Sequence, residues 1–89
     1  MYLISISIVE RICSFLNADG IRGEEKWIAN TTSKEACAAL VRNTETTANG
    51  ATYGIGSRQG ECFAEYGETG HDFDSTDWQT CIFTNTSKF

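Results

Sequence analysis

The stretch TSKEACAALV, residues 32–41, decides the fold because it carries the clearest helix signal in the chain. Thr32 and Glu35 match the T-x-x-E capping box, in which two side chains satisfy backbone N–H groups at the start of a helix. The residues that follow have helical periodicity, with an inward stripe made of Ala36, Cys37, Leu40 and Val41. The sequence therefore predicts one short amphipathic helix with a cysteine on its buried side.

The rest of the chain is predicted to be β structure joined by glycine-rich turns. The predicted strands are residues 1–9, 26–29, 48–55, 61–66 and 78–84. Residues 56–60 are expected to form a hairpin tip, and residues 67–77 a polar loop. One helix among several short strands gives an α+β fold.

The four cysteines are spread almost evenly, as Cys13, Cys37, Cys62 and Cys81, and none belongs to a C-x-x-C pair. That spacing is not typical of a zinc ribbon or a thioredoxin-type redox site. An even number of cysteines in a small domain favours two structural disulfides in an oxidising compartment, with reduced and buried cysteines as the alternative. Four cysteines allow three connectivities, and the spacing does not choose among them.

The composition fits one globular domain. At 89 residues the chain is long enough for a single domain. Its net charge of -5 and its scattered Lys and Arg residues argue against nucleic-acid binding, which needs clustered positive charge. Residues 1–9 are apolar but too short to cross a bilayer as a helix, so we expect no membrane insertion. They lack the features of a secretory signal, which favours a mature domain or an excised piece of a secreted protein, with a signal remnant as the alternative.

Three short motifs resemble the PAN/apple family. They are the run from Ser33 to Leu40, the run Gly50-Ala51-Thr52-Tyr53 and the run Glu61-Cys62-Phe63. The match covers about residues 13 to 83. In modules of that family a helix lies across a small antiparallel sheet, and the modules bind proteins or glycans in adhesive proteins. The resemblance implies the same architecture here: a small antiparallel sheet with one helix packed across it, stapled by disulfides.

The resemblance also implies a disulfide pairing. In this family a helix cysteine is bridged to a central strand, which pairs Cys37 with Cys62. A second bridge ties the two ends of the domain, which pairs Cys13 with Cys81. Closing loops of about 25 and about 68 residues would stabilise the domain by roughly 3.5 and 4.4 kcal/mol through chain entropy.

The chain departs from the family pattern at one pair of positions. A second helix cysteine and its partner are often present in the family, but Val41 and Ala48 stand at those positions here. We expect a small hydrophobic contact in place of that bond. On this interpretation residues 13–84 form the module, residues 1–12 an N-terminal strand and residues 85–89 a flexible tail.

The sequence gives little support to catalysis. His71 is the only histidine and lies in a predicted loop, where a solvated side chain is the simpler interpretation. No G-x-S-x-G motif is present. A carboxylate pair for glycoside hydrolysis could come from Glu61, Glu65 or Glu68, but 89 residues leave little room for a cleft. We therefore expect a non-enzymatic protein without a cofactor.

One acidic stretch is a weak candidate for a calcium loop. Its acids are Glu68, Asp72, Asp74 and Asp77, and oxygen ligands suit Ca²⁺. The EF-hand pattern is not met, because its glycine and its closing glutamate are missing. We expect a solvated acidic loop and no metal.

Two N-x-[ST] motifs, at Asn30 and Asn85, are candidate glycosylation sites. Asn30 precedes the predicted helix and Asn85 lies in the tail, so both are expected to be exposed. Together with the disulfides, these motifs predict a secreted glycoprotein.

Recognition by the surface is the function that remains. The candidate ligand-binding residues are Tyr53, Arg58, Tyr66 and Trp78, which offer aromatic rings and a guanidinium to a protein or glycan. The alternative for Trp78, as for Trp27 and most other aromatic residues, is a place in the core.

A second hypothesis is self-assembly with other copies of the chain. Residues 1–9 make an apolar strand without charge or proline, and its alternate residues are Tyr2, Ile4, Ile6 and Ile8. Such a strand is a liability unless it is paired. It can pair within its own domain, or it can be donated to the sheet of a neighbour, and a head-to-tail contact that does not close gives a filament.

Overall fold

The computed structural model describes residues 13–71 and 76–83 of the chain. Its elements are β1 (Gly20–Ile21), β2 (Glu24–Asn30), α2 (Lys34–Thr44), β3 (Gly50–Gly54), the 3-10 turn η1 (Gly56–Arg58), β4 (Glu61–Tyr66), β5 (Gly70–His71) and β6 (Trp78–Ile82). The predicted strand at residues 1–9, with Tyr2, Ile4, Ile6 and Ile8, lies outside the described residues, as does the tail with Asn85.

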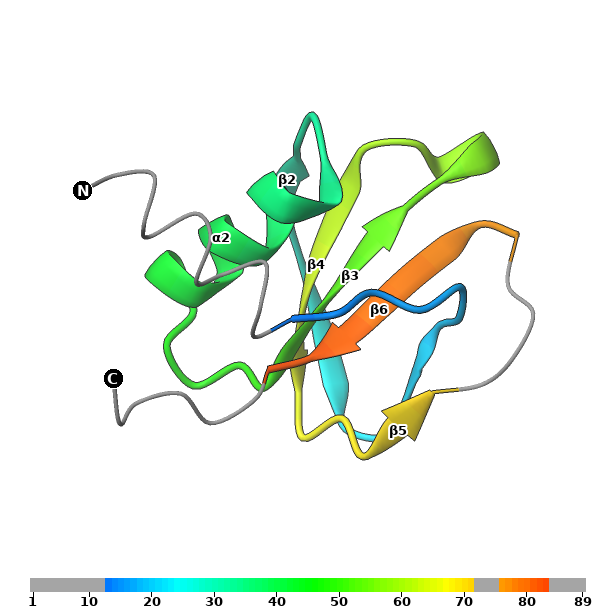
Figure 1. Cartoon of the computed structure of the whole chain (residues 1–89). Coiled ribbons are helices and arrows are strands. Elements are labelled where there is room, and N and C mark those ends of the chain that lie inside the picture. Colours follow the sequence, from blue (N-terminus) through cyan, green and yellow to red (C-terminus); the bar gives the residue numbers. More distant parts are fainter. Residues whose placement is uncertain (1–12, 72–75, 84–89) are drawn as a thin grey trace.

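The four longer strands form one antiparallel sheet in the order β2-β4-β3-β6. Helix α2 lies across one face of this sheet and contacts β3 and β4 (Figure 1). The short strands β1 and β5 pair with each other in a second, two-stranded sheet. The predicted α+β architecture, a small antiparallel sheet with one helix packed across it, is confirmed.

Helix α2 begins one residue later than the capping box predicts. The N-cap is Ser33, whose hydroxyl accepts the backbone N–H of Ala36 at 3.0 Å, so the prediction of Thr32 as the cap is wrong. Ser33 has extended backbone angles, φ -159° and ψ 161°, which is the usual conformation of an N-cap residue. Glu35 still lies in the first turn, where a negative charge interacts favourably with the helix dipole.

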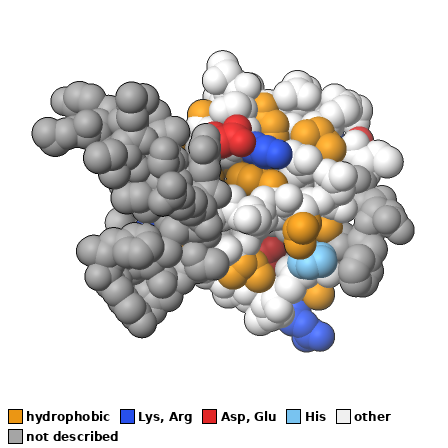
Figure 2. Space-filling model, viewed as in Figure 1, with side chains coloured by type: hydrophobic (Ala, Val, Ile, Leu, Met, Phe, Trp, Pro, Cys, Tyr) orange, Lys and Arg blue, Asp and Glu red, His pale blue; other side chains and the backbone are white. Residues whose placement is uncertain are grey.

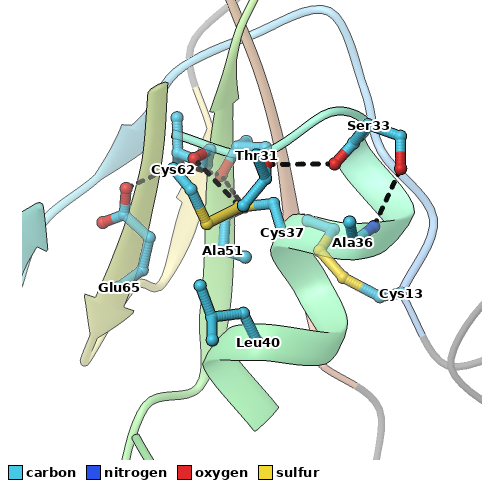
Figure 3. Close-up of a disulfide and its surroundings, with 12 residues drawn as sticks. Cys13, Thr31, Ser33, Ala36, Cys37, Leu40, Ala51, Cys62 and Glu65 are labelled. Atoms are coloured by element: carbon cyan, nitrogen blue, oxygen red, sulfur yellow. Dashed lines mark hydrogen bonds between the residues drawn. A yellow bond between two sulfur atoms is a disulfide. The ribbon is translucent and has the colours of Figure 1, made fainter. Parts of the chain in front are cut away.

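Both disulfides pair as the family resemblance implied. Cys37 on α2 is bonded to Cys62 on β4, with Cα atoms 5.5 Å apart (Figure 3). Cys13 is bonded to Cys81 on β6, with Cα atoms 5.4 Å apart and a sequence separation of 68. Two structural disulfides indicate that the protein folds in an oxidising environment.

The core between helix and sheet is built from small side chains. Its buried members are Cys13, Cys37, Ala38, Val41, Ala51, Tyr53, Cys62, Ala64 and Cys81. Ala48 packs against the same cluster as Val41, in agreement with the expected apolar replacement of a third disulfide. Because such small side chains bury little apolar surface, the two covalent bridges supply a large share of the stability.

Two backbone pairings outside the main ladders of the four-stranded sheet were not predicted. Residues 67–77 were expected to be a loop, but Gly70–His71 forms strand β5, which pairs with Gly20–Ile21. Leu16 also exchanges two backbone hydrogen bonds with Thr80, of 2.9 and 3.0 Å, at the edge of β6 that does not pair with β3. These pairings join residues far apart in sequence, so no local pattern announced them.

Candidate functional site

The candidate site is the face of the four-stranded sheet that points away from helix α2. Alternation along the strands places Cys62 and Ala64 in the core under the helix and turns Phe63 and Glu65 to the other face. In Figure 3 the side chain of Glu65 lies on the side of β4 away from α2. We call this surface, on which Thr52 and Thr80 also lie, the outer face.

Three aromatic residues run across the outer face, and we call Trp27, Phe63 and Trp78 the aromatic row. Trp27 on β2 lies directly opposite Phe63 on β4. The rings of Phe63 and Trp78 meet edge to face, with centroids 5.4 Å apart. Trp27 is 53% exposed, so a large apolar ring faces solvent at one end of the row.

Arg58 lies at the other end of the aromatic row. Its guanidinium carbon is 5.0 Å from the centroid of the Trp78 ring, which is a cation–π contact. The same guanidinium forms an ion pair of 3.0 Å with Glu61. The hydrogen-bonding groups of Arg58 and Glu61 therefore stand beside the apolar rings.

The structure brings together only two of the four predicted ligand-binding residues, Arg58 and Trp78. Tyr53 is 4% exposed, and its hydroxyl accepts a hydrogen bond of 2.9 Å from Gln59, so it belongs to the core. Tyr66 lies on the helix side of the sheet, where its hydroxyl donates to the carboxylate of Glu45. That bond lowers the pKa of Glu45 and raises the pKa of Tyr66.

Next to the aromatic row lies a group of acids that we call the acidic cluster: Asp19, Glu25, Glu65 and Glu68. Glu25 on β2 is directly opposite Glu65 on β4, two residues along the strands from Trp27 and Phe63. One carboxylate oxygen from each of Asp19, Glu25 and Glu65 lies within 4.8 Å of the others. Glu65 is 2% exposed and Glu68 is 3% exposed, which is unusual for ionisable side chains.

Two threonine hydroxyls hold the buried acids of this cluster. Thr52 donates to Oε2 of Glu65 at 2.5 Å, and Thr80 lies 2.8 Å from Oε2 of Glu68. The two hydroxyls are 2.8 Å from each other. Burial raises the pKa of Glu65 to about 8 and the pKa of Glu68 to about 7, although the threonine hydrogen bonds act in the opposite direction.

Glu68 reaches the outer face because its backbone is fixed by Asn49. The Asn49 side chain donates to the carbonyl of Glu68 at 2.7 Å and accepts its N–H at 3.0 Å. The carboxyl group then lies between two glycine backbones, since a Cβ on Gly20 would stand 2.1 Å from Oε2 and a Cβ on Gly50 would stand 2.4 Å from Oε1. A side chain at either glycine would displace the carboxyl group.

The two described acids of the candidate calcium loop, Glu68 and Asp77, make different contacts. Glu68 lies within the outer face, whereas Asp77 accepts a hydrogen bond of 3.0 Å from Ser57 beside the 3-10 turn. Asp72 and Asp74 lie outside the described residues. Of the two candidate glycosylation sites, Asn30 is exposed at the end of β2.

The distribution of side-chain types can be followed on one face of the molecule. On the face shown in Figure 2, hydrophobic side chains appear in several small groups, and Lys and Arg side chains do not gather into a patch. Within the described ranges, no helix has the length and apolar character needed to cross a membrane.

Sequence reasoning missed Trp27, Phe63 and the acidic cluster. The run Glu24-Glu25-Lys26 beside Trp27 was a usable signal, because charges on a strand indicate an exposed edge. The meeting of Asp19, Glu25, Glu65 and Glu68 had no such signal, since it depends on the register of β2 against β4. Comparisons of the chain with protein-family models, with curated proteins and with solved structures found no match.

Proposed function

We propose that the chain is an extracellular, non-enzymatic binding module of the PAN/apple type, which recognises a glycan or a protein surface through its aromatic row. The observation that carries this proposal is the exposed ring of Trp27 in line with Phe63 and Trp78. Exposed aromatic residues that gather on one face are typical of recognition surfaces. The family resemblance adds support, because the helix across the sheet and both disulfide pairs that it implied are present.

The geometry favours a glycan as the ligand. The C–H groups on one face of a pyranose ring pack against an aromatic ring, while its hydroxyl groups need polar partners at the edge. Trp27 offers an exposed ring for the first contact. At the far end of the row, Arg58 and Glu61 offer a donor and an acceptor for the second.

A glycan array probed with the wild-type protein and with Trp27→Ala tests this proposal. Loss of an anchoring tryptophan is expected to weaken binding at least about tenfold. Leu16→Ala is the matched control, because Leu16 is also an exposed apolar residue, at 47%, but lies outside the row. An array without hits, or equal binding by the wild type and Trp27→Ala, would remove the glycan assignment.

The alternative of assembly by a donated N-terminal strand rests on residues outside the described ranges. Neither edge of the four-stranded sheet favours the addition of a donated strand. The edge strand β2 carries the charges of Glu24, Glu25 and Lys26, which oppose the addition of a strand, and the edge of β6 already pairs with Leu16. Deletion of residues 1–9 should therefore leave a monomeric and binding-competent module. Loss of polymers on that deletion, measured by light scattering, would favour assembly instead.

A further inference from the structure

The three carboxylates of Asp19, Glu25 and Glu65 have the spacing of ligands around one large divalent cation. Their oxygens lie within 4.8 Å of one another. Oxygens bound to one Ca²⁺ ion can lie at most about 5 Å apart, because Ca–O distances are about 2.3–2.6 Å. The spacing therefore fits Ca²⁺.

A fourth carboxyl group, that of Glu68, is an independent sign of a missing positive charge. Glu68 is 3% exposed, and its Oε1 atom has no hydrogen-bond partner within the described part of the chain. The group points into the acidic cluster, since its Cδ atom and that of Glu65 lie 2.7 and 3.3 Å from the Cβ position of Gly20. A buried carboxyl oxygen without a partner is costly.

Other acidic groups lie around these carboxyl groups. Besides burial, the charges of Glu68 and Glu25 raise the pKa of Glu65. The charges of Asp19 and Glu25 raise the pKa of Glu68, whereas the hydrogen bond from Thr80 and the charge of His71 on β5 lower it. Glu25 and Glu65 are also directly opposite each other, and like charges in that position destabilise a sheet. A bound cation would remove the repulsion.

We propose that Asp19, Glu25 and Glu65 bind a Ca²⁺ ion on the outer face, with Glu68 supplying a fourth negative charge beside it. Carboxylate oxygens are the ligands that Ca²⁺ prefers, and water can complete its six to eight positions. The ligands come from the segment before β1, from β2 and from β4, so the ion would tie the two-stranded sheet to the four-stranded one. This site is separate from the proposed ligand contacts, although Glu25 and Trp27 share one face of β2.

Thermal unfolding with and without Ca²⁺ tests the site directly. For a dissociation constant of about 1 mM, typical of extracellular modules, 10 mM Ca²⁺ raises the ratio of folded to unfolded protein about elevenfold. We expect the wild type to show this increase at pH 8. NaCl of equal ionic strength controls for screening of surface charge.

Two substitutions on β2 make a matched pair for this experiment. Glu25→Gln removes a proposed ligand, and Glu25 is exposed, so the variant should fold. Glu24→Gln makes the same change of charge at the neighbouring residue, whose side chain points to the other face of the strand. We expect the response to Ca²⁺ to fall to less than twofold in Glu25→Gln and to remain in Glu24→Gln.

Terbium luminescence excited through tryptophan gives a second readout, because Trp27 is two residues from Glu25 on the same face of β2. Tb³⁺ should bind the wild type and be displaced by Ca²⁺ but not by the same concentration of Mg²⁺. Absence of stabilisation and of terbium binding would overturn the proposal. An equal loss of the Ca²⁺ response in Glu25→Gln and Glu24→Gln would also overturn it, because it would mean that only the net charge of the protein matters.

Discussion

Replacement of Glu68 by glutamine is expected to stabilise the domain at pH 8 and to change its stability little at pH 5. Burial raises the pKa of Glu68 to about 7 in the folded protein, whereas a glutamate in an unfolded chain titrates at about 4.3. Between these values the folded protein holds a proton that the unfolded chain has released. The stabilisation is therefore complete below about pH 4.3 and is lost as the pH rises through about 7.

The size of the effect follows from the same difference. One group changes the free energy of unfolding by at most about 1.4 kcal/mol per pH unit across this window. Structural relaxation around an ionised Glu68 reduces the total change in the free energy of unfolding over this window. We therefore expect Glu68→Gln to be more stable than the wild type by about 1–3 kcal/mol at pH 8.

Urea unfolding at pH 5, 6, 7 and 8, in the presence of a chelator, measures this difference. The free energy of unfolding of the wild type should fall as the pH rises from 5 to 8. It should fall less steeply in Glu68→Gln, in which Glu65 still contributes to the pH dependence. Glu24→Gln is the control, since Glu24 is exposed and lies outside the acidic cluster. The reasoning fails if wild-type stability is constant or rises between pH 5 and 8, or if Glu68→Gln has the wild-type slope.

Three further predictions concern the fold itself. Replacing both Cys37 and Cys62 by alanine should lower the free energy of unfolding by about 3.5 kcal/mol, and a midpoint in urea unchanged from the oxidised wild type would contradict this. Ser33→Ala should cost about 1 kcal/mol, because it removes the N-cap bond, while Thr32→Ala should cost much less; equal losses would refute the assigned cap. Gly50→Ala should lower the melting temperature by overpacking, at a cost of about 1–3 kcal/mol, since its Cβ would stand 2.3 Å from a backbone oxygen; a wild-type melting temperature would show that the sheet adjusts freely.

The elements that depend on local sequence could be predicted without the structure. Helix α2 follows from its periodicity, and strand β4 from its alternating pattern. The N-cap was placed one residue early because Thr32 and Ser33 both have hydroxyl groups that can cap a helix. The hydrogen bond from the Ala36 N–H to the Ser33 hydroxyl and the extended backbone of Ser33 distinguish them.

The sequence by itself determined an α+β domain with a small, cysteine-rich core, because periodicity and turn residues act over a few neighbouring positions. Tertiary structure alone decided the outer face. The register of β2 against β4 sets Glu25 opposite Glu65 and Trp27 opposite Phe63, and a one-residue shift would send those side chains to the opposite face. Asp19 and Glu68 arrive there through the pairing of β1 with β5, which joins residues about 50 positions apart and leaves no periodic trace in the sequence.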